Sequence, residues 1–155
     1  MNQHWPRWIF ASISKHFDDR KGNLPLYIEG QLRQPGVKDL LELRIDGPYL
    51  TEESRNYWRL YVEVSVIVQS TMDAHDYHRI HRNCGFVASL FTAIPLYKLG
   101  DSVDDNPTEQ FGCLSLVQDI GKRERIQINH FGKIDPATDL LQSSVEAHYV
   151  THLTA

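Results

Sequence analysis

Three histidines spaced three residues apart are the strongest candidates for chemistry in this sequence. His75, His78 and His81 lie in the stretch DAHDYHRIHRNCG, together with Asp73 and Asp76. Imidazole nitrogens and carboxylate oxygens bind zinc in enzymes, where three protein ligands usually leave one coordination position open. The spacing therefore raises the hypothesis of a small metal-dependent enzyme that uses the His75/His78/His81 helix with a carboxylate such as Asp76.

Helical geometry argues against one site formed by all three imidazoles. On an α-helix they would fan through about 120° and climb about 9 Å, so only a neighbouring pair could chelate one ion. The other face of the same helix carries an apolar stripe: Tyr77, Ile80, Cys84, Val87, Ala88 and Phe91. We therefore predict a helix that is capped by Asp73, ends before Pro95 and turns its histidines towards solvent or a partner.

No other motif in the sequence indicates catalysis. GFVAS and FGCLS lack the glycines on both sides of serine that a nucleophile elbow requires, and no glycine-rich phosphate loop occurs. Asp104, Asp105 and Glu109 do not have calcium-loop spacing. Residues 121–125 (GKRER) could contact phosphate groups, but their pattern favours a charged hairpin tip. We expect no enzymatic activity, no metal and no cofactor.

The composition is that of a globular protein, with 41% hydrophobic and 23% charged residues. A net charge of -4 argues against a dedicated nucleic-acid-binding protein. Cys84 and Cys113 fall in apolar patterns, which favours two reduced, buried thiols. No secretory signal or apolar stretch of about 20 residues is evident, so a soluble protein is expected. The 155 residues fit one domain, residues 1–155.

Periodicity along the rest of the chain predicts the fold class. Residues 4–17 have helical spacing, whereas residues 47–56 (GPYLTEESRN) have the composition of a loop. The segments around IGKRE are expected to form a hairpin, and residues 135–142 (DPATDLLQ) a short helix. Strands are predicted at residues 24–32, 40–46, 57–69, 111–119, 125–131 and 144–153. The expected fold is α+β: an antiparallel β-sheet with a long β-hairpin, packed against an N-terminal helix and a central helix.

The strand at residues 57–69 carries the clearest pattern. Its even positions from Trp58 to Val68 are all apolar, and its odd positions include three further apolar residues. Thirteen residues at about 3.3 Å each span about 43 Å, which exceeds the roughly 39 Å diameter of a compact domain of this size. We infer that a partner subunit covers the odd face of the projecting hairpin. The candidates for this contact are Tyr57, Arg59, Tyr61, Glu63 and Ile67 of the strand, and Glu52, Glu53 and Arg55 before it.

The order of the expected elements resembles a known family. An amphipathic helix leads into LPLYIEG, a hairpin follows with NYWRLYVEVSVIVQS as its second arm, and DAHDYHRIHRNCGFVASLF and SSVEAHYVTHL supply the covering helix and the last strand. This order resembles the tail terminator (tail-completion or neck) proteins of long-tailed bacteriophages. The resemblance spans nearly the whole chain as a pattern of elements, and no residue role is transferred with it.

The resemblance implies a structural protein of the virion. Such proteins form homo-oligomeric rings, typically hexamers, that cap the tail tube, join it to the head connector and let DNA pass through the lumen. The implied location is the tail or neck of the virion, with assembly in the host cytoplasm. Asp101, Asp104, Asp105 and Glu109 could line the lumen, where negative charge would keep DNA from adhering. A cytosolic adaptor module is a further alternative.

Overall fold

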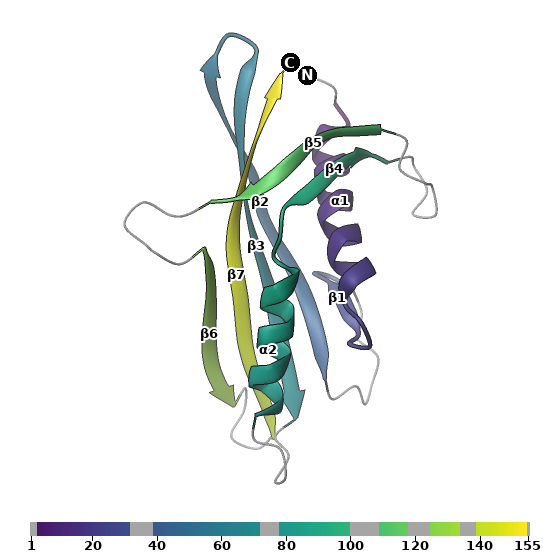
Figure 1. Cartoon of the computed structure of the whole chain (residues 1–155), viewed down its shortest axis with the longest axis vertical. Coiled ribbons are helices and arrows are strands. Elements are labelled where there is room, and N and C mark those ends of the chain that lie inside the picture. Colours follow the sequence, from purple (N-terminus) through teal and green to yellow (C-terminus); the bar gives the residue numbers. More distant parts are fainter. Residues whose placement is uncertain are drawn as a thin grey trace.

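A long, twisted β-sheet runs through the molecule, and two helices pack against it (Figure 1). The computed structural model describes residues 3–31, 39–71, 78–99, 109–117, 125–133 and 139–154. The elements are α1 (Trp5–Arg20), β1 (Leu26–Ile28), β2 (Leu40–Ser54), β3 (Tyr57–Thr71), α2 (Arg79–Leu90), β4 (Ile94–Lys98), β5 (Glu109–Leu116), β6 (Ile126–Lys133) and β7 (Leu140–Thr154). The expected α+β fold, with an N-terminal helix, a central helix and a long hairpin, is confirmed.

Three strands of 15 residues each form a central ribbon. β3 pairs antiparallel with β2 on one side and with β7 on the other, from Tyr57 opposite Thr154 to Thr71 opposite Leu140. β1 pairs in parallel with the start of β2. Because 15 extended residues span about 50 Å, the ribbon is longer than the helices that cover it. The tip of the β2–β3 hairpin projects at the top of Figure 1.

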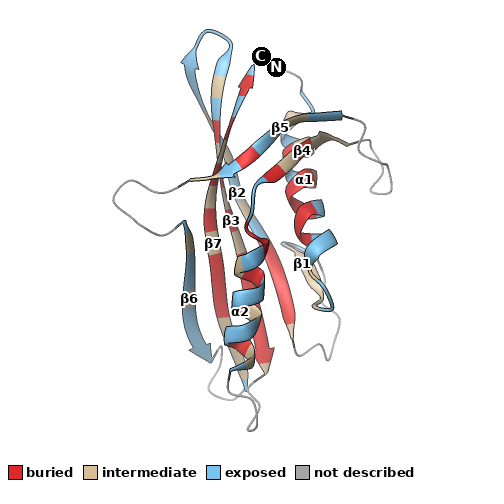
Figure 2. Cartoon of the chain, viewed as in Figure 1, coloured by how far each residue is buried: buried red, intermediate tan, exposed pale blue. Residues whose placement is uncertain are grey.

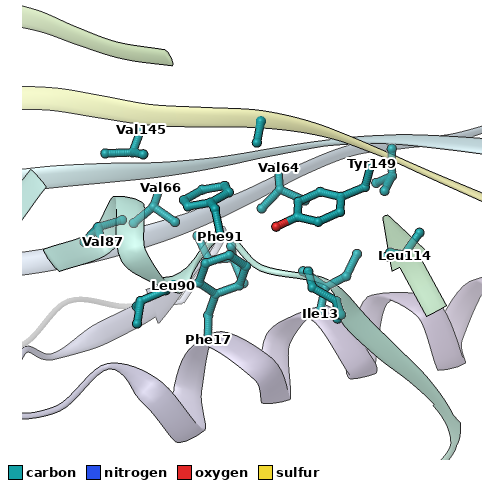
Figure 3. Close-up of a cluster of buried hydrophobic side chains, with 14 of the residues drawn as sticks. Ile13, Phe17, Val64, Val66, Val87, Leu90, Phe91, Leu114, Val145 and Tyr149 are labelled. Carbon is teal, nitrogen blue, oxygen red and sulfur yellow. The ribbon is translucent and has the colours of Figure 1, made fainter. Parts of the chain in front are cut away.

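The apolar face of the ribbon forms the core, as the alternation in the sequence predicts. Val62, Val64 and Val66 of β3 are at most 1% exposed. Figure 3 shows Val64 and Val66 between the sheet and the residues of α1 and α2, including Ile13 and Val87. Burial of each such aliphatic side chain contributes about 1.5–3 kcal/mol to folding. The two helices therefore lie on the same face of the ribbon.

An aromatic contact and a polar contact attach helix α1 to the C-terminal end of α2, at Leu90 and Phe91. Phe17 meets Phe91 edge-to-face, with ring centroids 5.1 Å apart. His16 is buried, and its Nε2–H donates a hydrogen bond to the carbonyl oxygen of Leu90 at 2.9 Å. Burial lowers the pKa of His16 because a low-dielectric site disfavours the imidazolium form. A neutral histidine thus links α1 to the end of α2.

The predicted loop at residues 47–56 is wrong, because most of it belongs to β2. The strand continues to Ser54 across a bulge between Asp46 and Tyr49. Pro48 is tolerated there because a bulge removes the need for a ladder hydrogen bond from its nitrogen. The hairpin turn contains only Arg55 and Asn56, and Asn56 has a φ of 63°. The hairpin is therefore longer than the sequence predicted.

The predicted hairpin between β5 and β6 is also wrong. Both strands pair antiparallel with β7, so they run in the same direction and cannot form a hairpin with each other. Leu116 of β5 pairs with Tyr149, and Ile126 of β6 pairs with Ala147, which is only two positions before Tyr149 in β7. The two strands thus follow one another along the same edge of β7. Residues 118–124 lie outside the described residues.

Three predicted helix boundaries differ from the structure. Helix α2 begins at Arg79, whereas the capping pattern predicted a start after Asp73, which lies outside the described residues. It ends at Leu90, and Pro95 lies within β4 instead of terminating the helix. Leu140–Gln142, predicted as the end of a short helix, form the start of β7. At Pro95 and at Leu140–Gln142, sheet pairing overrides a local propensity that is weak on its own.

The two cysteines have different surroundings, although both were predicted to be buried. Cys84 lies on the inner face of α2, and burial raises the pKa of its thiol. Cys113 lies on β5 and is exposed. Its strand pairs mainly with β4 near the end of the sheet. The prediction therefore holds for Cys84 and fails for Cys113.

Candidate assembly surface

The face of the β2–β3–β7 ribbon opposite the helices carries the side chains that the sequence assigned to a subunit contact. We call this surface the open face; it contains the odd-numbered residues of β3 and the even-numbered residues of β7. Within the described part of the chain, both helices pack on the other side (Figure 3). Figure 2 shows that exposure increases along the ribbon towards the hairpin tip.

Most of the predicted contact residues have accessible side chains. Tyr57 is 37% exposed, and the side chain of Arg59 is 52% exposed. Tyr61 and Glu63 are partly buried by their neighbours on the ribbon. Glu52, Glu53 and Arg55 are exposed at the hairpin tip. These residues can reach a partner without any change in the fold.

Ile67 is the exception among the predicted contact residues. Only 7% of its surface is exposed, although it lies on the open face. It is in register with Glu42 of β2 and Ser144 of β7, which are themselves buried. The prediction that Ile67 needs a partner to cover it is therefore wrong, because neighbouring residues of the same chain already do so.

A tyrosine and a histidine are paired in the middle of the open face. The rings of Tyr61 and His148 are stacked with centroids 5.5 Å apart, and the Tyr61 hydroxyl is hydrogen-bonded to His148 Nδ1. The same nitrogen lies 3.5 Å from Glu63 Oε1. Tyr61 and His148 are diagonal neighbours on adjacent strands, a separation that aromatic side chains can bridge.

A second tyrosine–histidine pair lies four residues nearer the hairpin tip. Tyr57 and His152 are stacked with centroids 5.1 Å apart and an interplanar angle of 8°. His152 Nε2 lies 3.5 Å from Glu53 Oε2, and Arg59 Nε lies 3.6 Å from the other oxygen of that carboxylate. Because both strands advance by four residues, this pair repeats the first one about 13 Å away.

The two pairs give the open face a partly exposed aromatic and imidazole surface with carboxylates beside it. Tyrosine is enriched at protein interfaces because it combines a large apolar ring with a polar end. The contacts of His148 and His152 with these tyrosines were not predicted from the sequence. Antiparallel register between residues 57–69 and 144–153 would have identified them, since pairing fixes the diagonal neighbours.

His78 and His81, two of the three histidines with the regular spacing, lie with His130 at the other end of the ribbon. His81 of α2 meets His130 of β6 with ring centroids 4.7 Å apart, and His78 lies next to His81 at 6.1 Å. Among the described residues, no group of three or more His, Cys, Asp or Glu is placed to hold a metal ion. His75 and Asp76 lie outside the described residues.

The predicted lumen residues are described only at their C-terminal end. Glu109 begins β5, is exposed, and forms an ion pair with Lys98 in which Nζ and Oε2 are 2.7 Å apart. Asp101, Asp104 and Asp105 lie outside the described residues. The role of this acidic segment therefore stays a prediction.

Comparisons with known proteins support the fold class. No family model and no curated protein matches the sequence. One solved structure resembles this chain with a TM-score of 0.50, over 97% of this chain and 95% of that chain, at 11% sequence identity. At so low an identity, the similarity shows only that the two chains share an α+β fold. Across the described residues, no helix has both the length and the apolarity needed to span a membrane.

Proposed function

We propose that this chain is a structural subunit of a bacteriophage virion, a ring-forming tail terminator or neck protein. In this role it caps the tail tube and joins it to the head connector and neck proteins. The observation that carries the proposal is the β2–β3 hairpin, whose 15-residue arms extend beyond the helices and present an accessible aromatic surface. A surface of this kind favours contact with another protein over chemistry on a small substrate.

The open face has the properties of a subunit contact. Tyr57 and Tyr61 are held in place by stacking on His152 and His148, so little side-chain entropy is lost when a partner covers them. Glu53 is shared between Arg59 and His152, which leaves charged atoms at the rim of the surface. An aromatic centre with a charged rim is the usual anatomy of a protein interface.

The overall charge is compatible with a ring whose lumen lets DNA pass. The net charge of -4 gives the chain no general attraction for the phosphate backbone. A ring of such subunits would let DNA pass through its lumen without sequence-specific binding. The proposed partners are other copies of this chain in a ring, most simply a hexamer, together with the tail tube protein and the head connector.

Removal of the gene from a phage that carries it tests this function. We expect particles from the deletion strain to show tails of irregular length and heads without tails in negative-stain electron microscopy. Mass spectrometry of purified wild-type virions should find the chain as a component. Virions that lack the chain, or a deletion strain with normal particles, would exclude a terminator or neck role.

A further inference from the structure

The outer edge of β6 exposes apolar side chains next to unpaired backbone. β6 pairs with β7 from Ile126 to Lys133, and none of the other described strands pairs with its second edge. Ile128 is 41% exposed and Phe131 is 59% exposed. Free N–H and C=O groups on such an edge can pair with a strand of another chain.

A second unpaired edge lies on the projecting part of β2. β1 pairs with β2 only as far as Leu43, so from Tyr49 to Ser54 the strand has β3 as its single partner among the described strands. Tyr49 is 51% exposed. Its hydroxyl donates a hydrogen bond to Asp46 Oδ1 at 2.8 Å, which keeps the ring beside the strand. The two free edges belong to different ends of the ribbon.

The two edges carry opposite charge. Residues 46–63, which contain the β2 edge and the hairpin turn, have four carboxylates and two arginines. Residues 125–133, which contain the β6 edge, have Arg125 and Lys133 and no carboxylate. Both of these cations are exposed. Opposite potentials on two surfaces favour their association and set their register.

We propose that the Tyr49–Ser54 edge of β2 in one copy pairs with the β6 edge of the next copy, so that the sheet continues from subunit to subunit. This inference rests on the proposed ring-forming function and names the contact that builds the ring. The contact joins two different surfaces, so each copy of a pair keeps one free edge: β6 in the first copy and β2 in the second. A head-to-tail contact of this type closes into a ring when the rotation between copies permits.

Charge reversal on each edge tests the contact. Glu52→Lys with Glu53→Lys reverses the β2 edge, and Arg125→Glu with Lys133→Glu reverses the β6 edge. Light scattering coupled to size-exclusion chromatography measures association of the full chain up to millimolar concentration. We expect each double variant alone to associate about tenfold more weakly or worse than the wild type, because like charges then face each other.

An equimolar mixture of the two double variants is the decisive measurement. In alternating order every contact again joins opposite charges, so the mixture should regain oligomers close to the wild-type size. Asp18→Lys with Asp19→Lys makes the same change in charge on exposed positions of α1 and should associate like the wild type. Circular dichroism checks that all variants remain folded.

The outcomes separate this inference from the proposed function. Wild-type oligomers that neither double variant weakens, or a mixture that stays dissociated, would overturn the edge pairing while leaving the ring role in place. A wild-type chain that remains monomeric up to millimolar concentration would also overturn it. The proposed ring-forming function is tested separately, by the deletion strain and by mass spectrometry of the virion.

Discussion

The two ends of the β2–β3–β7 ribbon have the same alternating sequence but different surroundings. In the lower half, where α2 covers the sheet, Val66 and Val68 are at most 1% exposed. At the tip, Trp58 continues the same even-numbered series but is only half-buried. Alternation therefore determines which face is apolar, whereas the covering helices determine how much of that face leaves water. The uncovered end is the one available to partners.

Lysine at position 64 should cause the largest loss of stability, because this position lies in the half of the ribbon that the helices cover. Val64 is fully buried beneath the helices, and Val64→Lys would place an unpaired charge in the core. We expect a loss of about 4 kcal/mol or more in the free energy of unfolding, measured by urea denaturation. Ser65→Lys is the matched control, since Ser65 lies next to it on the open face and should cost about 0.5 kcal/mol. Equal losses would mean that both faces are core.

Lysine at position 67 should have an intermediate effect. Ile67 is on the open face but only 7% exposed, so the aliphatic stem of lysine stays covered while its ammonium group reaches towards solvent. We expect Ile67→Lys to lower the free energy of unfolding by about 2 kcal/mol in the same urea experiment. A variant as stable as the wild type would show that Ile67 is not covered by its own chain.

Lysine at position 61 should affect assembly more than folding. Tyr61 is partly exposed and contacts His148, so Tyr61→Lys removes a stacking contact and a hydrogen bond without placing a charge in the core. We expect a loss in stability of less than about 1 kcal/mol and clearly weaker self-association by light scattering. Phe10→Lys alters an aromatic residue on α1 that is 45% exposed, and should leave association unchanged. If both variants associate alike, the open face is not a subunit contact.

Local sequence patterns predicted the elements better than their connections. The even series of β3 was predicted correctly, because burial imposes a period of two on it. The passage of β2 through Pro48 was missed, because proline in a strand requires a bulge that only the pairing with β3 reveals. The parallel course of β5 and β6 was missed for a related reason, since both strands depend on β7 for their direction.

The candidate surface was predicted in part. Tyr57 and Tyr61 were found because a wholly solvated strand face seldom carries aromatic residues. Their contacts with His152 and His148 depend on the register between β3 and β7, which lie about 90 residues apart in the chain. Long-range register is set by the packing of the whole sheet, so the strand pattern alone could not supply it.

The smallest expected effect concerns pH and the buried hydrogen bond between α1 and the end of α2. His16 is buried, and this burial holds its pKa below the ordinary value of 6.5, while its Nε2–H donates to Leu90. The unfolded chain therefore binds more protons than the folded chain as the pH falls through that value, and the free energy of unfolding should decrease. His16→Gln keeps a donor for Leu90 but does not titrate.

We expect the wild type to lose thermal stability between about pH 7.5 and about pH 5.5, and His16→Gln to lose less over the same interval. The difference between the two proteins in the loss of thermal stability with falling pH isolates His16, because the other histidines are present in both. Lys15→Gln is the control, since Lys15 precedes His16 on the exposed side of α1. Equal slopes for all three proteins would mean that the imidazole of His16 is protonated as readily in the fold as in the unfolded chain.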